Sequence, residues 1–401
     1  MERFPRARAG AIACALVFAG CLRLGGGFIE SPPGHTRAGV LELRWHRPMV
    51  VETVFGEHRP VYRGSPAYDP TRDVVYAGSN DNALFAIRGW DGAVVWRFEA
   101  LGRVDSTPHP DGDDVLFGAA DGAMYCINAS TGALQWRFAT SAEVLHEPIV
   151  IGDSVYFVNS NDAVFAVARR DGSVRWRYRR NAPGGITASG HAGLASFGRR
   201  IYAAFSDGTV ACLDASDGSV LWSQDTAREL DDLDTSNPGH AAIDVDTTPV
   251  VIDDMVYVAS YTAGVFALDA VGGGQRWRLG DLRGVSGLGS DGRYLYAASS
   301  QAGLVKIDPL DGTIVWRREA GNLAAIGAVA IGDGLLAVPS ADQAMYVVRT
   351  DSGEVLDGVR PGRGFNGLPT RVGSRLFAES NGGTLYAFAL RPERSAPAPT
   401  R

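Results

Sequence analysis

Two short apolar runs joined by an Asp-Gly pair recur along this chain. The clearest copy is GTVACLDASDGSVLW at residues 208–222, where apolar and polar residues alternate before Asp217-Gly218 and a second run ends in Trp222. Glycine adopts a positive φ without a Cβ clash, so Asp-Gly between two such runs is a strong signal for a hairpin turn. The pattern therefore predicts a β-hairpin over residues 208–222.

Further copies of this hairpin follow one another at intervals of 39 to 55 residues. The positions equivalent to Trp222 are Trp45, Trp96, Trp136, Trp176, Trp277, Trp316 and, in a weaker copy, Asp357. Each repeat also carries a turn-marked start and a further apolar run, such as residues 154–157 or 254–257, which leaves no room for helices. A period of about 45 residues with four short strands predicts a four-stranded propeller blade.

The two ends of the repeat region complement each other. The last copy, residues 382–390, lacks its final strand, and the first strand, residues 40–46, lacks the three that should precede it. Pairing them closes the ring and removes exposed sheet edges. The sequence thus predicts an all-β, eight-bladed β-propeller of four-stranded antiparallel blades over residues 40–390. Seven blades is the alternative if the Asp357 copy is not a blade; Val347 and the turn at 351–353 favour eight.

The segments outside the repeats have other compositions. Residues 1–20 combine three arginines with a short apolar run and end in Ala19-Gly20 before Cys21, which predicts a lipoprotein signal peptide with Cys21 as the lipidated residue. An ordinary secretory signal cleaved nearby is the alternative. Residues 21–39 are expected to form a flexible tether and residues 391–401 a disordered tail.

Composition narrows the classes of function. The 401 residues are 45% hydrophobic and 21% charged, which is enough to bury a core. Removing residues 1–20 takes away three arginines and one glutamate, so the net charge moves from −7 to −9, and a basic nucleic-acid surface is not implied. Cys126 and Cys212 occupy equivalent repeat positions and are expected to be buried and unpaired. The repeated tryptophans are expected to fill the space between blades, because a ligand site needs only one or two.

No catalytic arrangement is visible in the sequence. The seven histidines are scattered without metal-ligand spacing, and there is neither a Gly-x-Ser-x-Gly elbow nor a phosphate loop. The hairpins resemble the repeat of pyrroloquinoline-quinone (PQQ) enzymes, which also ends in Gly-x-x-x-Trp. That resemblance implies blade structure, and the vicinal cysteine pair of the quinoprotein dehydrogenases is absent. We therefore expect no enzyme activity, cofactor or metal, with a PQQ-dependent dehydrogenase as a less favoured alternative.

Binding loops are expected where the repeat is irregular. The longest interval contains residues 223–248, with seven acidic residues against one arginine, and the preceding repeat contains RRNAPGGITASG at residues 179–190. Adjacent blades should place both loops near one rim. The acidic loop lacks the spacing of a calcium site, so it is either solvated or binds basic groups of a protein. Asp246 has a repeat equivalent in Asp105 and can be a turn cap, whereas Asp244 has none.

Together, the signal, the propeller and DVDTTPVV at residues 244–251 resemble the BamB family of outer-membrane assembly lipoproteins. The resemblance implies a non-enzymatic, monomeric scaffold, lipid-anchored at the periplasmic face of the outer membrane. Its implied partners are the POTRA domains of a BamA-type protein and unfolded outer-membrane proteins. Leu22 after Cys21 agrees with outer-membrane sorting. A generic periplasmic propeller that binds another envelope protein remains the alternative.

The same resemblance implies a partner surface made of two parts. Its acidic pair corresponds to Asp244 and Asp246. Its second part, an apolar loop with an arginine one blade earlier, corresponds to residues 181–190, which offer Ile186 and Thr187. No arginine stands in the matching stretch; Arg179 and Arg180 lie just upstream.

Overall fold

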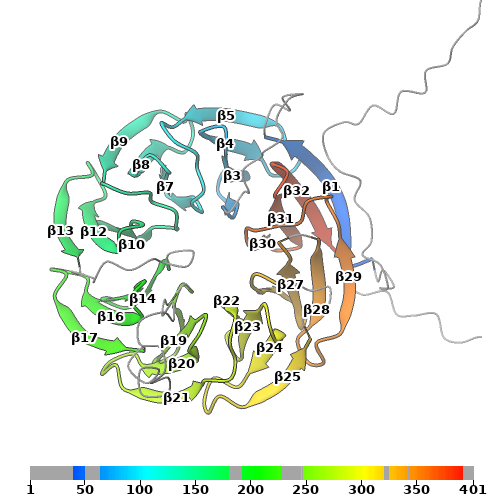
Figure 1. Ribbon diagram of the computed structural model, residues 1–401. Coiled ribbons are helices and arrows are strands. Elements are labelled where there is room, and N and C mark those ends of the chain that lie inside the picture. Colours follow the sequence, from blue (N-terminus) through cyan, green and yellow to red (C-terminus); the bar gives the residue numbers. More distant parts are fainter. Residues whose placement is uncertain are drawn as a thin grey trace, which may run out of the picture.

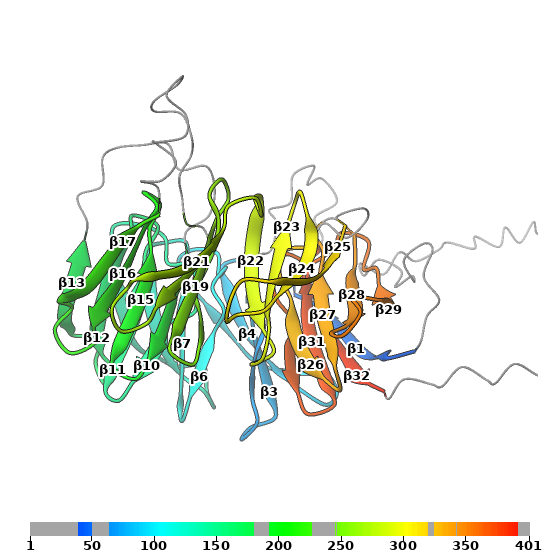
Figure 2. The same ribbon diagram turned by 90° about the horizontal axis from the view of Figure 1, so that it is seen from below.

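The protein is an eight-bladed β-propeller. The computed structural model describes residues 39–49, 64–179, 192–226, 245, 247–319, 325–341 and 343–391. All regular secondary structure in these ranges is β-strand, and the strands form eight four-stranded antiparallel sheets. The sheets are arranged in a ring (Figure 1) and, from the side, stand next to one another with their turns at the two faces (Figure 2). The predicted fold class is confirmed.

The blades are numbered in chain order, and their strands run from the centre of the ring outward. Blade 1 contains β2 (Ala67–Asp69), β3 (Val74–Ser79), β4 (Ala83–Arg88) and β5 (Val94–Glu99); blade 2 contains β6 (His109–Asp111), β7 (Asp114–Gly118), β8 (Ala123–Asn128) and β9 (Leu134–Ala139); blade 3 contains β10 (Ile149–Ile151), β11 (Ser154–Val158), β12 (Ala163–Ala168) and β13 (Val174–Arg179); blade 4 contains β14 (Leu194–Phe197), β15 (Arg200–Ala204), β16 (Thr209–Asp214) and β17 (Val220–Asp225).

The second half of the ring has the same order. Blade 5 contains β18 (Val250–Ile252), β19 (Met255–Ser260), β20 (Gly264–Asp269) and β21 (Gln275–Leu279); blade 6 contains β22 (Val285–Ser290), β23 (Leu295–Ser299), β24 (Gly303–Ile307) and β25 (Ile314–Arg318); blade 7 contains β26 (Val329–Gly332), β27 (Leu335–Pro339), β28 (Met345–Arg349) and β29 (Val355–Val359); blade 8 contains β30 (Thr370–Val372), β31 (Arg375–Ser380), β32 (Thr384–Leu390) and β1 (Leu41–Pro48).

Burial along the strands follows their place in the blade. The second and third strands, such as β11 and β12, are buried along almost their whole length because neighbouring blades cover both of their faces. The outer strands alternate between exposed and covered residues, as β13 does. This explains why the middle strands read as continuous apolar runs and the outer strands as alternating ones.

Each tryptophan of the repeat joins its own blade to the next one. The ring of Trp176 lies over Gly218, where an added Cβ would be 2.6 Å from the ring, and its Nε1 donates to the carbonyl of Ala215 at 2.9 Å. Gly218 has a φ of 74°, which favours glycine at this turn. Seven tryptophans make the equivalent bond: Trp45, Trp96, Trp136, Trp176, Trp222, Trp277 and Trp316. The predicted role between blades is confirmed.

The two ends of the chain close the ring. β1 pairs with β32 in an antiparallel register from Leu41↔Leu390 to Pro48↔Thr384 (Figure 1). Asp357 lies in β29, a complete outer strand, so the weakest repeat is a true blade. The closure and the blade number are both as predicted.

Asp357 stands in place of a tryptophan because blade 8 has no hairpin between its third and outer strands. The register of β1 places Leu41 where the other blades have their turn glycine, and a Cβ at those glycines would collide with the ring. The buried Asp357 instead accepts hydrogen bonds from the amides of Leu41 at 2.9 Å and Gly358 at 2.8 Å. A small hydrogen-bonding side chain replaces the ring at this boundary.

Candidate partner interface

Most of the predicted functional residues lie outside the described residues. These are Cys21, Arg180, Ile186, Thr187, Asp244 and Asp246, together with the signal peptide, most of the tether and residues 392–401. Arg179 is described: it is the last residue of β13, pairs with Ala163 of β12 and has an exposed side chain. The structure therefore shows the scaffold around the predicted interface.

The residues on either side of Asp246 are firmly packed. Val245 is 1% exposed and belongs to the apolar cluster between blades 4 and 5. The hydroxyl of Thr247 accepts from the amide of Ala259 at 2.8 Å and donates to its carbonyl at 3.2 Å. Ser106 makes the same pair of bonds to Gly118 in blade 2. The residues flanking Asp246 thus have a fixed place in the scaffold.

The structure brings the described ends of the two irregular loops together. The amide of Gly193, at the start of blade 4, donates to Thr248 Oγ1 at 2.9 Å. Ala192 and Val245 belong to the same apolar cluster. The prediction that the two loops adjoin is confirmed for these ends, which meet at the inner end of adjacent blades.

Blade 2 shows how an acid at the position of Asp246 can be neutralised within the fold. Asp105 is 5% exposed, and its Oδ2 accepts from Arg103 Nε at 2.5 Å; Arg103 also contacts Glu143 at 3.2 Å. In the sequence of blade 5, the position of Arg103 is occupied by Asp244. The sequence of blade 5 therefore lacks, at this one position, the arginine that neutralises the acid in blade 2.

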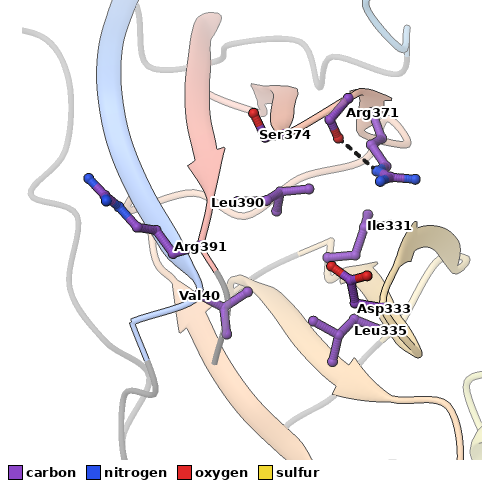
Figure 3. A pocket seen from close by; sticks show the side chains of 9 residues that line it. Val40, Ile331, Asp333, Leu335, Arg371, Ser374, Leu390 and Arg391 are labelled. Carbon is purple, nitrogen blue, oxygen red and sulfur yellow. Dashed lines mark hydrogen bonds between the residues drawn. The ribbon is translucent and has the colours of Figure 1, made fainter. Parts of the chain in front are cut away.

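The closing boundary between blades 7 and 8 contains a cavity that the sequence did not predict. It has a volume of about 300 Å³ and lies between the start of β1, the end of β32 and the turns that follow β26 and β30 (Figure 3). Val40, Ile331 and Leu390 form apolar walls, and Arg371 at its edge donates from Nε to the carbonyl of Gly373 at 3.0 Å. No residue that lines it is among the site residues predicted from the sequence.

Ionisable groups in the core serve packing. Cys126 and Cys212 are free and buried, as predicted, and burial raises the pKa of each thiol to about 12, so neither is a reactive thiolate at neutral pH. Burial lowers the pKa of Lys306, whose Nζ donates to the carbonyl of Thr350 in the next blade at 2.7 Å.

Within the described ranges, no three acidic, histidine or cysteine residues come together as a metal site. The same ranges contain no helix of the length and apolarity that crossing a membrane requires.

Comparison with known structures first defines the class of fold. BamB from Moraxella catarrhalis matches with a TM-score of 0.73 and 19% identity, covering 87% of this chain and 100% of that one. The quinohemoprotein alcohol dehydrogenase of Comamonas testosteroni matches with a TM-score of 0.65 and 14% identity, covering 92% of this chain and 80% of the dehydrogenase. At these identities the matches establish the fold alone: an eight-bladed propeller of PQQ-like repeats.

Sequence comparison then gives the family. The family model described as outer membrane protein assembly factor BamB matches residues 90–318 and 302–391. BamB of Alkalilimnicola ehrlichii is 26% identical over 208 residues, 51% of this chain and 52% of that protein; BamB of Yersinia pestis is 26% identical over 188 residues, 45% of each. The aligned stretch spans about half the length of these relatives. The chain belongs to the BamB family.

Proposed function

We propose that this chain is a non-enzymatic scaffold subunit of the outer-membrane β-barrel assembly complex. Its partner is a BamA-type protein, bound through POTRA domains, and it aids the folding and insertion of outer-membrane proteins. The observation that carries this proposal is the family match over residues 90–318 and 302–391. A complete eight-bladed ring with the fold of BamB supports it.

We assign the partner contact to the loops that lead into blades 4 and 5. The acidic residues Asp244 and Asp246 would receive basic groups of the partner, with Ile186 and Thr187 adding apolar contact and Arg179 and Arg180 adding charge. Two observations support this choice: the described ends of the two loops meet through Gly193 and Thr248, and blade 5 has Asp244 where blade 2 has the neutralising Arg103.

Charge reversal tests this interface. The full chain carrying Asp244→Arg and Asp246→Arg should lose most of its co-purification with a BamA-type protein from detergent-solubilised membranes, because buried or half-buried charge pairs are sensitive to reversal. A matched control is Asp217→Arg with Asp254→Arg, which changes the same charge in exposed turns at the opposite ends of the strands in blades 4 and 5. Undiminished association of the first variant would remove the proposed interface.

The proposed location is the periplasmic face of the outer membrane, with Cys21 as the lipid-bearing residue. The support is the sequence pattern before Cys21. We expect the wild-type chain to incorporate labelled palmitate and to sediment with outer-membrane vesicles, and Cys21→Ser to do neither. Labelling that survives in Cys21→Ser would contradict the assignment.

The proposal includes the absence of catalysis. Its support is membership of the BamB family, since the likeness to the alcohol dehydrogenase concerns the fold alone. We expect the purified chain to reduce no redox dye in the presence of PQQ, calcium and simple alcohols. Turnover above that of a heat-denatured sample would support the dehydrogenase alternative.

A further inference from the structure

The outer strand of blade 3 carries a row of exposed arginines. Arg175, Arg177 and Arg179 of β13 are all exposed. Arg177 and Arg179 alternate with Trp176 and Tyr178, which pack against the core shared with blade 4, so the two arginines point away from it. Within the described residues, none of the three arginine side chains forms an ion pair or a hydrogen bond.

Equivalent arginines in blades 1, 2 and 5 are neutralised inside their own blade, whereas Arg317 of blade 6 forms no ion pair within the described residues. Arg276 in blade 5 corresponds to Arg175 and contacts Asp269 Oδ2 at 2.5 Å. Arg137 in blade 2 corresponds to Arg177 and contacts Asp121 Oδ2 at 2.6 Å. In blade 1, Arg97 contacts Glu99 at 2.5 Å. An acid therefore accompanies the arginine in each of these three blades.

Blade 3 has no acidic residue at any of the three positions that pair with an arginine in blades 1, 2 and 5. Ala168 stands where blade 5 has Asp269, Asn161 where blade 2 has Asp121, and Arg179 where blade 1 has Glu99. The result is a concentration of positive charge on one strand of a chain whose net charge is −7. The neighbouring positive charges of the row repel one another, and negative charges of a partner would relieve that repulsion. The row is therefore electrostatically complementary to an acidic partner.

The geometry of the row matches an extended chain. β13 is the outermost strand of its sheet, so one of its edges has no strand partner (Figure 1). Arg175 lies at a bulge, whereas Arg177 and Arg179 lie on the regular part of the strand. Side chains two residues apart on a regular strand are about 7 Å apart, which is also the spacing of alternate side chains in an extended peptide. An added strand could pair with the free edge and set its acidic side chains opposite the arginines.

We propose that the outer edge of blade 3 binds an extended segment of a protein partner that carries acidic residues at alternate positions. A row one strand wide favours a linear partner over the plane of a membrane. This surface shares only Arg179 with the interface assigned under the proposed function, and it does not depend on that assignment.

Fluorescence anisotropy with defined peptides tests the proposal on the full chain. The probe is a labelled peptide with alternating glutamate and valine, and its comparison is the same peptide with glutamine in place of glutamate. Arg175→Glu with Arg177→Glu should weaken binding of the glutamate peptide by about tenfold, and added salt should weaken binding to the wild type. The matched control is Arg276→Glu with Arg278→Glu in blade 5, which should change binding by less than about twofold.

Each outcome decides the matter. Selective binding of the glutamate peptide, lost in the blade 3 variant and kept in the blade 5 variant, supports the proposal. No binding, equal binding of the glutamine peptide, or stronger arginine-dependent binding to phosphatidylglycerol vesicles overturns it. Both double variants should still co-purify with the BamA-type protein, because Asp244 and Asp246 are unchanged, so failure of this proposal is distinguishable from failure of the proposed function.

Discussion

Seven blade boundaries and the eighth differ in how they are joined. At seven, a tryptophan packs on the turn glycine of the next blade and donates to a turn carbonyl, as Trp176 does with Gly218 and Ala215. At the boundary between blades 7 and 8, Asp357 bonds to the amide of Leu41. The comparison shows that the turn of one blade decides which residue can end the preceding repeat. A tryptophan side chain fits there only where that turn has a glycine, because a Cβ at the turn would collide with the indole ring.

Six of the seven tryptophan boundaries also have a second ring, which the closing boundary lacks; at Trp136 the corresponding residue is Leu116. The ring of Tyr202 lies 6.0 Å from that of Trp222, and Tyr257 and Trp277 form the same kind of pair at 5.7 Å. In blade 7 the corresponding positions are Ala337 and Asp357. The closing boundary therefore has neither of the two rings, and the cavity lined by Val40, Ile331 and Leu390 lies at the same boundary.

The largest effect should come from removing a tryptophan at a regular boundary. Trp222 is 9% exposed, and Trp222→Ala should lower the free energy of unfolding by about 3–5 kcal/mol, because both the buried ring and its hydrogen bond are lost. Urea unfolding followed by circular dichroism measures this. Trp90→Ala is the control, since Trp90 is 65% exposed in a turn, and its effect should stay within about 0.5 kcal/mol. Equal effects would show that the regular boundary contributes no special stability.

An intermediate effect should come from forcing the regular arrangement onto the closing boundary. Asp357→Trp should destabilise the protein by about 1–3 kcal/mol, because the new ring meets the Leu41 side chain and the buried hydrogen bonds are lost. Adding Leu41→Gly should recover part of that loss, although glycine alone in β1 is unfavourable. A double-mutant cycle in urea measures the coupling; strictly additive losses would contradict the dependence of residue 357 on residue 41.

The smallest effect concerns another irregular residue of the closing blade. Glu379 is 2% exposed, and its Oε1 has no hydrogen-bond partner among the described residues. The equivalent positions in blades 1, 2 and 5 are Gly78, Gly118 and Ala259. Burial, followed by the nearby Asp105, raises the pKa of Glu379 well above its ordinary value of 4.5. The folded protein therefore keeps this proton to higher pH than the unfolded chain does.

The sign of the pH effect follows from that order of pKa values. The stability contributed by protonated Glu379 is complete below its unfolded pKa and declines as the pH rises toward the folded pKa. Between about pH 4 and pH 8, the wild type should therefore lose more stability than Glu379→Gln, which has no carboxyl group to titrate at this position. Chemical unfolding at the two pH values measures the difference; parallel stabilities would contradict it.

Much of the fold could be predicted because the same pattern of turn and apolar residues recurs in one blade after another. Hairpin turns at residues such as Gly218, strands of fixed length and two complementary chain ends required only local conformational preferences and the period of the repeat. The candidate site was harder to predict. The sequence marked the irregular loops, and the structure shows the described ends of those loops joined through Gly193 and Thr248.

Other features could not be read from the sequence because they depend on what lies opposite a residue. Arg175 in blade 3 and Arg276 in blade 5 occupy the same repeat position, yet only Arg276 faces an acid, Asp269, across its own hairpin. Recognising the arginine row therefore required the strand register, which decides which residues are neighbours across a sheet.

The sequence by itself determined the kind of blade, the number of blades and the way the ring closes, because turn chemistry and apolar alternation are local properties. Only the tertiary structure decided why Asp357 replaces a tryptophan, where the cavity beside Val40 opens, and which arginines remain without an acid. Those outcomes depend on contacts between residues as far apart as Leu41 and Asp357, and such contacts form only when the ring closes.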